Sequence, residues 1–104
     1  MFGWGVKTIS TDELADKLAA GRPVLIDVRE PYEFAEGHVP GAVNIPLGSL
    51  RARLSDLDPA AETLLICHSG NRSKRAARQL DRAGFTHAHN VRGGTLAWRG
   101  RLEK

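Results

Sequence analysis

The apolar residues of this chain change their spacing repeatedly along the sequence, from the pattern of a β-strand to that of a helix and back. Strand-like runs occupy residues 6–9, 24–28, 42–45, 63–66 and 87–91, and helix-like segments follow Ser10 or occupy residues 31–36, 47–57 and 73–83. Strands that alternate with helices are typical of an α/β domain. Because the runs at 24–28 and 63–66 are almost continuously apolar, they indicate strands that are covered on both faces. The sequence therefore predicts an α/β fold with a largely parallel sheet.

Local signals give boundaries to several of these helices. Ser10 and Glu13 have the spacing of a capping box, and Gly21 is expected to end the helix that follows. A single amphipathic helix is predicted over residues 47–57, because apolar residues recur there every three or four positions, at Leu47, Leu50, Leu54 and Leu57. A further helix is predicted over residues 73–83, directly after a polar loop.

Length and composition exclude several classes of protein. The 104 residues suit one domain, which we expect to span residues 1–104 with its core at about 6–100. No apolar run approaches the ~18 residues of a membrane-spanning helix. Residues 1–7 lack the basic and apolar regions of a signal peptide, although Phe2 and Trp4 could pack on the domain or on another chain. The single cysteine, Cys67, excludes an intramolecular disulfide. Together with the short apolar runs, these features lead us to expect a cytoplasmic protein that binds no membrane.

Charged residues are distributed unevenly, although the formal net charge is only +3. Residues 1–66 carry six Lys or Arg against ten Asp or Glu, whereas residues 67–104 carry nine against two. No carboxylate occurs between Glu62 and Asp81, a gap that contains Arg72, Lys74, Arg75 and Arg78. A basic region can bind nucleic acid, but these bases surround the only cysteine. A pocket for a small anion explains both facts, so we expect no nucleic-acid partner.

Cys67 is the residue that most clearly indicates chemistry. It ends an apolar strand, and the polar loop His68-Ser69-Gly70-Asn71-Arg72-Ser73 follows it. Unpaired N–H groups and the positive end of a helix dipole favour a thiolate at such a place, and Gly70 allows the loop to form an anion-binding nest. Lys74 and Arg75 are expected in the first helical turn, where positive charge is unfavourable unless an anion binds. A lone cysteine can be simply a small buried residue, but these neighbours predict a reactive thiolate beside an anion site.

Three segments of the chain resemble the rhodanese-like sulfurtransferases. The first is DVREPYEFAEGHVPGAVNIP at residues 27–46, and the second is the Cys67 loop, which is similar to the family's Cys-x-x-Gly-x-Arg pattern. The third is VRGGTLAW at residues 91–98, similar to the family's Gly-Gly-x-x-Ala-Trp ending. The three segments occur in the family's order. The resemblance implies a single rhodanese-like domain with a five-stranded, mostly parallel sheet flanked by helices.

The resemblance also implies the chemistry of a thiosulfate sulfurtransferase. Cys67 would attack the outer sulfur of a small anionic donor such as thiosulfate, and its persulfide would pass that sulfur to cyanide, a thiol or a protein acceptor. Arg72 would help to hold the donor. The backbone N–H groups of the loop would bind the sulfur and its negative charge. This assigns substrate binding to His68, Ser69, Gly70, Asn71 and Ser73, and it implies no cofactor.

Further polar residues have a functional and a structural interpretation. Four charged residues of the first segment could form a relay or could pair structurally beneath the site, and we favour structural pairing: Asp27, Arg29, Glu33 and His38. His87 and His89 lie on one face of a regular strand. Because no third ligand has a convincing spacing, we expect no metal site there. His68 could face the donor or the acceptor.

Two other functional classes stay open. A Cys-dependent phosphatase or arsenate reductase on a related fold also uses a thiolate and an arginine, but it places five residues between them. Here four residues separate Cys67 from Arg72, and Ser73 stands where the longer loop has its arginine. This shorter loop suits a sulfur atom better than a phosphoryl group. The other class is a noncatalytic rhodanese-like binding module, which commonly lacks the cysteine that this chain retains.

Overall fold

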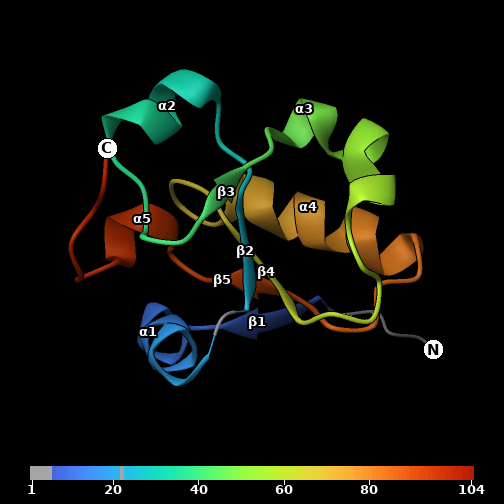
Figure 1. Cartoon of the computed structure of the whole chain (residues 1–104), viewed down its shortest axis with the longest axis horizontal. Helices are drawn as coiled ribbons and strands as arrows, with labels where there is room; N and C mark the ends of the chain where they lie inside the picture. The colour runs from blue at the N-terminus through green and yellow to red at the C-terminus, as the bar shows by residue number, and fades with distance from the viewer. Residues whose placement is uncertain (1–5, 22) are drawn as a thin grey trace.

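A computed structural model describes residues 6–21 and 23–104 of the chain (Figure 1). Phe2 and Trp4, and all but the last two of residues 1–7 considered for a signal peptide, fall at positions 1–5, which lie outside the described residues. Five parallel strands form one sheet in the order β1-β5-β4-β2-β3. These strands are β1 (Lys7–Ile9), β2 (Val24–Asp27), β3 (Val43–Asn44), β4 (Thr63–Ile66) and β5 (Ala88–Val91). The predicted α/β fold with a parallel sheet is confirmed.

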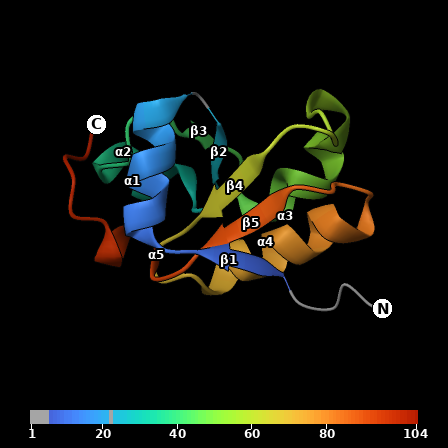
Figure 2. The same ribbon diagram turned by 90° about the horizontal axis from the view of Figure 1, so that it is seen from below.

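Helices cover both faces of the sheet (Figures 1 and 2). Helix α1 (Thr11–Ala20) covers one face, and the other face carries α3 (Leu47–Leu50), the 3-10 helix η1 (Arg51–Asp56) and α4 (Asn71–Arg82). The short helices α2 (Pro31–Glu36) and α5 (Gly94–Ala97) follow the carboxyl ends of β2 and β5. Among the described residues, no helix is long and apolar enough to cross a membrane.

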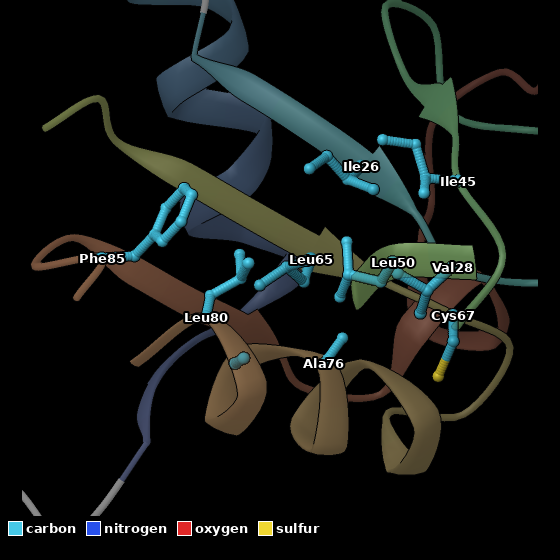
Figure 3. Packing of buried hydrophobic residues seen from close by; sticks show 10 residues of the cluster. Ile26, Val28, Ile45, Leu50, Leu65, Cys67, Ala76, Leu80 and Phe85 are labelled. Atoms are coloured by element: carbon cyan, nitrogen blue, oxygen red, sulfur yellow. The ribbon is translucent and has the colours of Figure 1, made fainter. Parts of the chain in front are cut away.

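The two layers bury separate apolar clusters, because successive residues of a strand point to opposite faces. Leu64 and Ile66 of β4 pack under α1 with Leu14, whereas Leu65 packs on the opposite side of the sheet. Figure 3 shows this second cluster, in which Cys67 lies at the end nearest the first turn of α4. Cys67 therefore lies on the same face of the sheet as Leu65, which is the face that α4 covers.

The capping box predicted for α1 is confirmed. The Glu13 N–H donates to Ser10 Oγ at 3.0 Å, and the Ser10 N–H donates to Glu13 Oε1 at 3.1 Å. Gly21 caps the other end, where its N–H donates to the Lys17 carbonyl oxygen at 3.1 Å. Each bond satisfies a backbone group that a helix end leaves without an intrahelical partner.

Two predicted helices differ from the structure. Residues 47–57 do not form a single α-helix, because α3 tightens into η1 after Leu50. Their apolar spacing of three and four residues lies between the periods of 3-10 and α-helices, so either geometry buries the same side. Helix α4 begins at Asn71, two residues before the predicted start, because Gly70 turns the chain with φ +106°. Arg72, rather than Lys74 or Arg75, is therefore the cation of its first turn.

Candidate active site

The Cys67 loop joins the central strand β4 to helix α4. It lies at the carboxyl end of a parallel sheet, which is where α/β folds bind their ligands. The neighbouring strand β2 holds its start in place, because the Val28 N–H donates to the Ile66 carbonyl oxygen at 2.9 Å. The first amides of α4 have no intrahelical partner, so they are available to an anion bound in the loop.

Glycines let the loop approach the neighbouring segment closely. Gly70 has a positive φ, and a Cβ there would lie 3.2 Å from the Gly93 nitrogen. Gly94 has φ +60°, and a Cβ there would overlap the carbonyl oxygens of Cys67 and His68. This contact allows the Thr95 N–H to donate to the Cys67 carbonyl oxygen at 2.8 Å. The start of α5 thus supports the loop from its backbone side, a role for Gly94 that sequence reasoning did not identify.

The Cys67 sulfur is surrounded by hydrogen-bond donors. The Gly70 N–H donates to Sγ at 3.1 Å, and the Ser73 N–H donates at 3.4 Å. The Ser73 hydroxyl oxygen also lies 3.4 Å from Sγ. Cys67 is 1% exposed and Ser73 is fully buried, so these contacts are largely shielded from bulk water. Donors that converge on one sulfur stabilise negative charge there.

The hydrogen bonds outweigh burial in setting the ionisation of Cys67. Burial by itself raises the pKa of the thiol, because it penalises the charged form. The Ser73 hydroxyl and the amides of Ser73, Gly70 and Ser69 act in the opposite direction, and the net pKa of Cys67 is lowered. A lowered thiol pKa gives more thiolate at neutral pH, and the thiolate is the nucleophilic form.

Comparisons with known proteins identify the family. The family model for the rhodanese-like domain matches residues 10–101. The chain belongs to this family. YtwF of Bacillus subtilis is 44% identical over 96 residues, which are 91% of this chain and 92% of that protein. A protein named sulfurtransferase from Allochromatium vinosum is 34% identical over 94 residues, 89% of this chain and 88% of its own.

A solved structure supports the same assignment. The crystal structure of a rhodanese-like domain protein from Staphylococcus aureus matches with a TM-score of 0.86 and 37% identity. The match covers 94% of this chain and 97% of that one. The single rhodanese-like domain with five parallel strands that the sequence indicated is therefore the fold of this protein.

Arg72 of this rhodanese-like domain is bound to a carboxylate on another helix. Its guanidinium donates to Glu33 Oε1 at 2.7 Å and to Oε2 at 3.0 Å. The arginine's hydrogen bond and charge lower the pKa of Glu33 to about 2 despite partial burial. The hydrogen bond to Glu33 is the main cause of the raised pKa of Arg72, and the charge of Cys67 raises it further. In the part of the chain that the structure describes, the Arg72 side chain makes no hydrogen bond to Sγ, which is bonded instead by the amides of Gly70 and Ser73 and contacted by the Ser73 hydroxyl.

The other charged residues of segment 27–46 bind different partners. Asp27 and Arg29 form a buried ion pair of 2.8 Å at the end of β2, and Arg29 also donates to the Gly37 carbonyl oxygen at 2.7 Å. His38 does not join this pair: its Nδ1 lies 3.0 Å from the Phe34 carbonyl oxygen, and its ring stacks on Phe34. Asp27 and Arg29 thus fasten the strand end that carries the motif.

The exposed part of the loop faces a cleft. His68, Ser69 and Asn71 are exposed, and His68 lines a cleft of about 440 Å³ that also includes Glu33 and Tyr32 of α2 and Leu96 of α5. A larger hollow of about 740 Å³ lies against α1 and Trp98, and its described lining carries no nucleophile or ionisable side chain. The cleft beside His68 is therefore the better place for a reactant.

Three further polar residues, Asn90, His87 and His89, lie on or beside strand β5. Asn90 of β5 accepts a hydrogen bond from the Ser73 hydroxyl, a role that the sequence analysis did not assign. The signal in the sequence was a polar residue, Asn90, within a predicted strand that is otherwise expected to be buried on that side. His87 and His89 have no neighbouring third metal ligand among residues 6–21 and 23–104, where no cluster of three such side chains occurs.

Proposed function

We propose that this protein is a sulfurtransferase that carries sulfane sulfur on Cys67, with thiosulfate as a donor. The observation that carries the proposal is the thiol of lowered pKa, with Sγ inside a loop of converging donors. Family membership and the relative named sulfurtransferase support the same class of reaction. Because the reaction needs a reduced single cysteine, a reducing compartment such as the cytoplasm suits it.

The first half-reaction is a displacement at sulfur. The Cys67 thiolate attacks the outer sulfur of thiosulfate, a new S–S bond forms, and the original S–S bond breaks with release of sulfite. The electron pair of the broken bond leaves on sulfite, so no external oxidant or reductant is needed. The negative charge then lies on the outer sulfur of the Cys67 persulfide. The amides of the loop and of the first turn of α4 that have no intrahelical acceptor would stabilise that charge.

The second half-reaction returns Cys67 to the thiolate. Cyanide, a small thiol or a cysteine of a protein acceptor attacks the outer sulfur and removes it. With cyanide, the product is thiocyanate and the leaving group is the Cys67 thiolate. We place Arg72 near the anionic donor, with Glu33 fixing the direction of its guanidinium. Exposed His68 lines the cleft and adjoins Cys67 in the chain, so we expect it to face the incoming donor or acceptor.

The geometry favours sulfur transfer over phosphate-ester hydrolysis. In the phosphatase interpretation, an arginine in the loop binds the equatorial oxygens of a phosphoryl group. In this chain Ser73 occupies the position at which the longer phosphatase loop has its arginine, and its side chain is fully buried against Sγ. The loop therefore has no guanidinium at the position from which the longer loop binds a phosphoryl group.

Mass spectrometry of the intact protein tests the proposal directly. Incubation with thiosulfate should add one sulfur atom, and cyanide should remove it with one equivalent of thiocyanate. Since Cys67 is the only cysteine, the Cys67→Ser variant is a complete control and should gain no sulfur. The assignment is wrong if the wild-type protein stays unmodified, or if folded Cys67→Ser turns over thiosulfate at a comparable rate.

A further inference from the structure

A buried chain of three polar side chains runs inward from the sulfur. Cys67 Sγ lies 3.4 Å from Ser73 Oγ, and the Ser73 hydroxyl donates to Asn90 Oδ1 at 2.5 Å. Cys67, Ser73 and Asn90 are 1%, 0% and 5% exposed. Asn90 is the only one of the three that touches no reacting atom, and neither half-reaction proposed above gives it a role.

The position of Asn90 is one that an apolar residue would ordinarily fill. In the sheet register Asn90 is paired with Leu65, two residues before Cys67, and paired residues point to the same face. Leu65 and Cys67 both belong to the apolar cluster under α4 (Figure 3). A buried amide in such a cluster is costly unless it is hydrogen-bonded. The bond to Ser73 offsets this cost, so it accounts for a buried amide at this position.

Ser73 has one hydroxyl proton and two neighbours that can accept it. Beside a thiol, that proton can go to Asn90 Oδ1, and the thiol S–H can donate to Ser73 Oγ. Beside a thiolate, the hydroxyl must turn and donate to Sγ, because the thiolate has no proton of its own. Asn90 Oδ1 would then face the Ser73 oxygen with no proton between them, which is unfavourable at the short distance observed.

We propose that Asn90 is a positioning residue whose side-chain amide reverses when Cys67 ionises. In the thiol form Oδ1 accepts the Ser73 proton, and in the thiolate form Nδ2–H donates to Ser73 Oγ while the hydroxyl donates to Sγ. Only the thiol proton leaves the site, to solvent, and no bond of Ser73 or Asn90 breaks. The reversal is a rotation about the Asn90 side chain, and it keeps the chain hydrogen-bonded in both charge states.

An amide suits this task because it is both a donor and an acceptor. A carboxylate can only accept, and an aliphatic side chain can do neither. Within the described residues, the bond to Ser73 is the single hydrogen bond of the Asn90 side chain, so rotation breaks no other hydrogen bond. The N–H of Ser73 stays directed at Sγ in both states, because it belongs to the helix backbone.

Other charged groups near Cys67 act from different elements. Arg72 of α4 interacts with the Cys67 charge and is paired with Glu33 of α2. Asp27 and Arg29 at the end of β2 pair with each other, and His68 adjoins Cys67 in the loop. Helices α3 and α5 contribute no ionisable side chain. None of these groups bonds to Asn90, so a response of its amide to Cys67 ionisation has to pass through Ser73 or through the field of the thiolate.

A pH titration followed by NMR separates these two routes. The side-chain ¹⁵N–H signals of Asn90, assigned by their loss in Asn90→Asp, should shift with a midpoint equal to the Cys67 pKa from ultraviolet absorbance of the thiolate. In Ser73→Ala the Cys67 pKa should rise, and the shift of the Asn90 signals at the new midpoint should fall to less than half. Equal shifts in wild type and Ser73→Ala, or no shift in wild type, would overturn the proposal.

A second measurement uses the acceptor-only side chain. Asn90→Asp should hold the Ser73 proton and raise the Cys67 pKa by about one unit. In the Ser73→Ala background the same substitution can act by charge alone, so its effect should be less than half as large. Equal effects in both backgrounds would mean that Asn90 acts without Ser73. If Asn90→Asp does not fold, assignment by conventional triple-resonance spectra lets the NMR titration decide.

These experiments do not depend on sulfur transfer. They follow the ionisation of Cys67 and the orientation of one amide in the absence of any donor. A protein that forms no persulfide but shows the coupled titration would retain this inference and refute the proposed function. The reverse result, turnover without coupling, would refute the inference alone.

Discussion

The Arg72 guanidinium binds both carboxylate oxygens of Glu33, 39 residues earlier in the chain, at 2.7 and 3.0 Å. The pair joins the first turn of α4 to α2 beside the Cys67 loop. Glu33 also accepts from the Glu30 N–H at 2.9 Å, which closes the cap of α2. The arginine next to the reactive loop is therefore oriented by a carboxylate that the start of α2 itself fixes.

Cys67 should react as a thiol of lowered pKa. Alkylation by iodoacetamide should show an apparent pKa below the ~8.5 of a free cysteine, because the loop donors stabilise the thiolate. The pH dependence of the modification rate gives this value directly. Little reaction below pH ~8.5 would mean that burial dominates and that the loop does not stabilise the thiolate.

Arg72→Ala should weaken the binding of thiosulfate more than other losses of charge on α4. We expect KM for thiosulfate to rise about tenfold, because a charge-assisted donor near the anion is lost. The Cys67 pKa should also rise, since a nearby cation is removed and Glu33 is left unpaired. Steady-state kinetics and alkylation profiles give both quantities.

Lys74→Ala and Arg75→Ala are the matched controls for Arg72→Ala. Both side chains are exposed and follow the first turn of α4. Each change should alter KM less than about threefold, and its effect should fade as salt screens the charge. A loss equal to that of Arg72→Ala would mean that the donor is bound by general attraction to α4.

Glu33 should make the fold sensitive to acid. Its pKa is lowered from 4.5 to about 2, so the pair contributes stability above pH 4.5 that is lost as the pH falls towards about 2. Urea unfolding of Glu33→Gln should show a smaller loss over this range than wild type, by about 1 kcal/mol or less after solvent screening. Glu36→Gln alters the same helix at an exposed carboxylate without an ion pair among the described residues, and it should behave like wild type.

Gly94→Ala should disrupt the Cys67 loop. The new methyl group would overlap the carbonyl oxygens of Cys67 and His68, and φ is +60°. We expect a loss of about 2 kcal/mol or more in the free energy of unfolding, with loss of turnover. Gly48→Ala is the control, because a Cβ there meets no atom within 4 Å and lies in helix α3. That change should be neutral or stabilise by up to about 1 kcal/mol.

Phosphate esters should be poor substrates. An aryl phosphate should be hydrolysed at a negligible rate beside thiosulfate turnover, because buried Ser73 stands where the longer phosphatase loop has its arginine. A colorimetric assay of wild type and Cys67→Ser measures the part of the rate that depends on Cys67. Comparable Cys67-dependent rates with both substrates would favour the phosphatase interpretation.

The order of strands and helices could be predicted because it depends on the spacing of apolar residues along the chain. The capping box at Ser10 and the apolar runs of β2 and β4 depend on neighbouring residues alone. The helix over residues 47–57 was predicted with the correct buried side but the wrong geometry, since its spacing fits two helical periods. The start of α4 was placed late because only the positive φ of Gly70 shows where the chain turns into the helix.

The sequence by itself determined the α/β class, the nucleophile candidate and the loop that follows it, because these depend on residues adjacent in the chain. Only the tertiary structure decided that Arg72 binds Glu33, that Ser73 binds Asn90 and that Gly94 supports the Cys67 loop. Each of these contacts joins segments that lie apart in the sequence. Their partners follow from the register of β4 with β5 and from the placement of α2 beside α4, and no local periodicity encodes either of them.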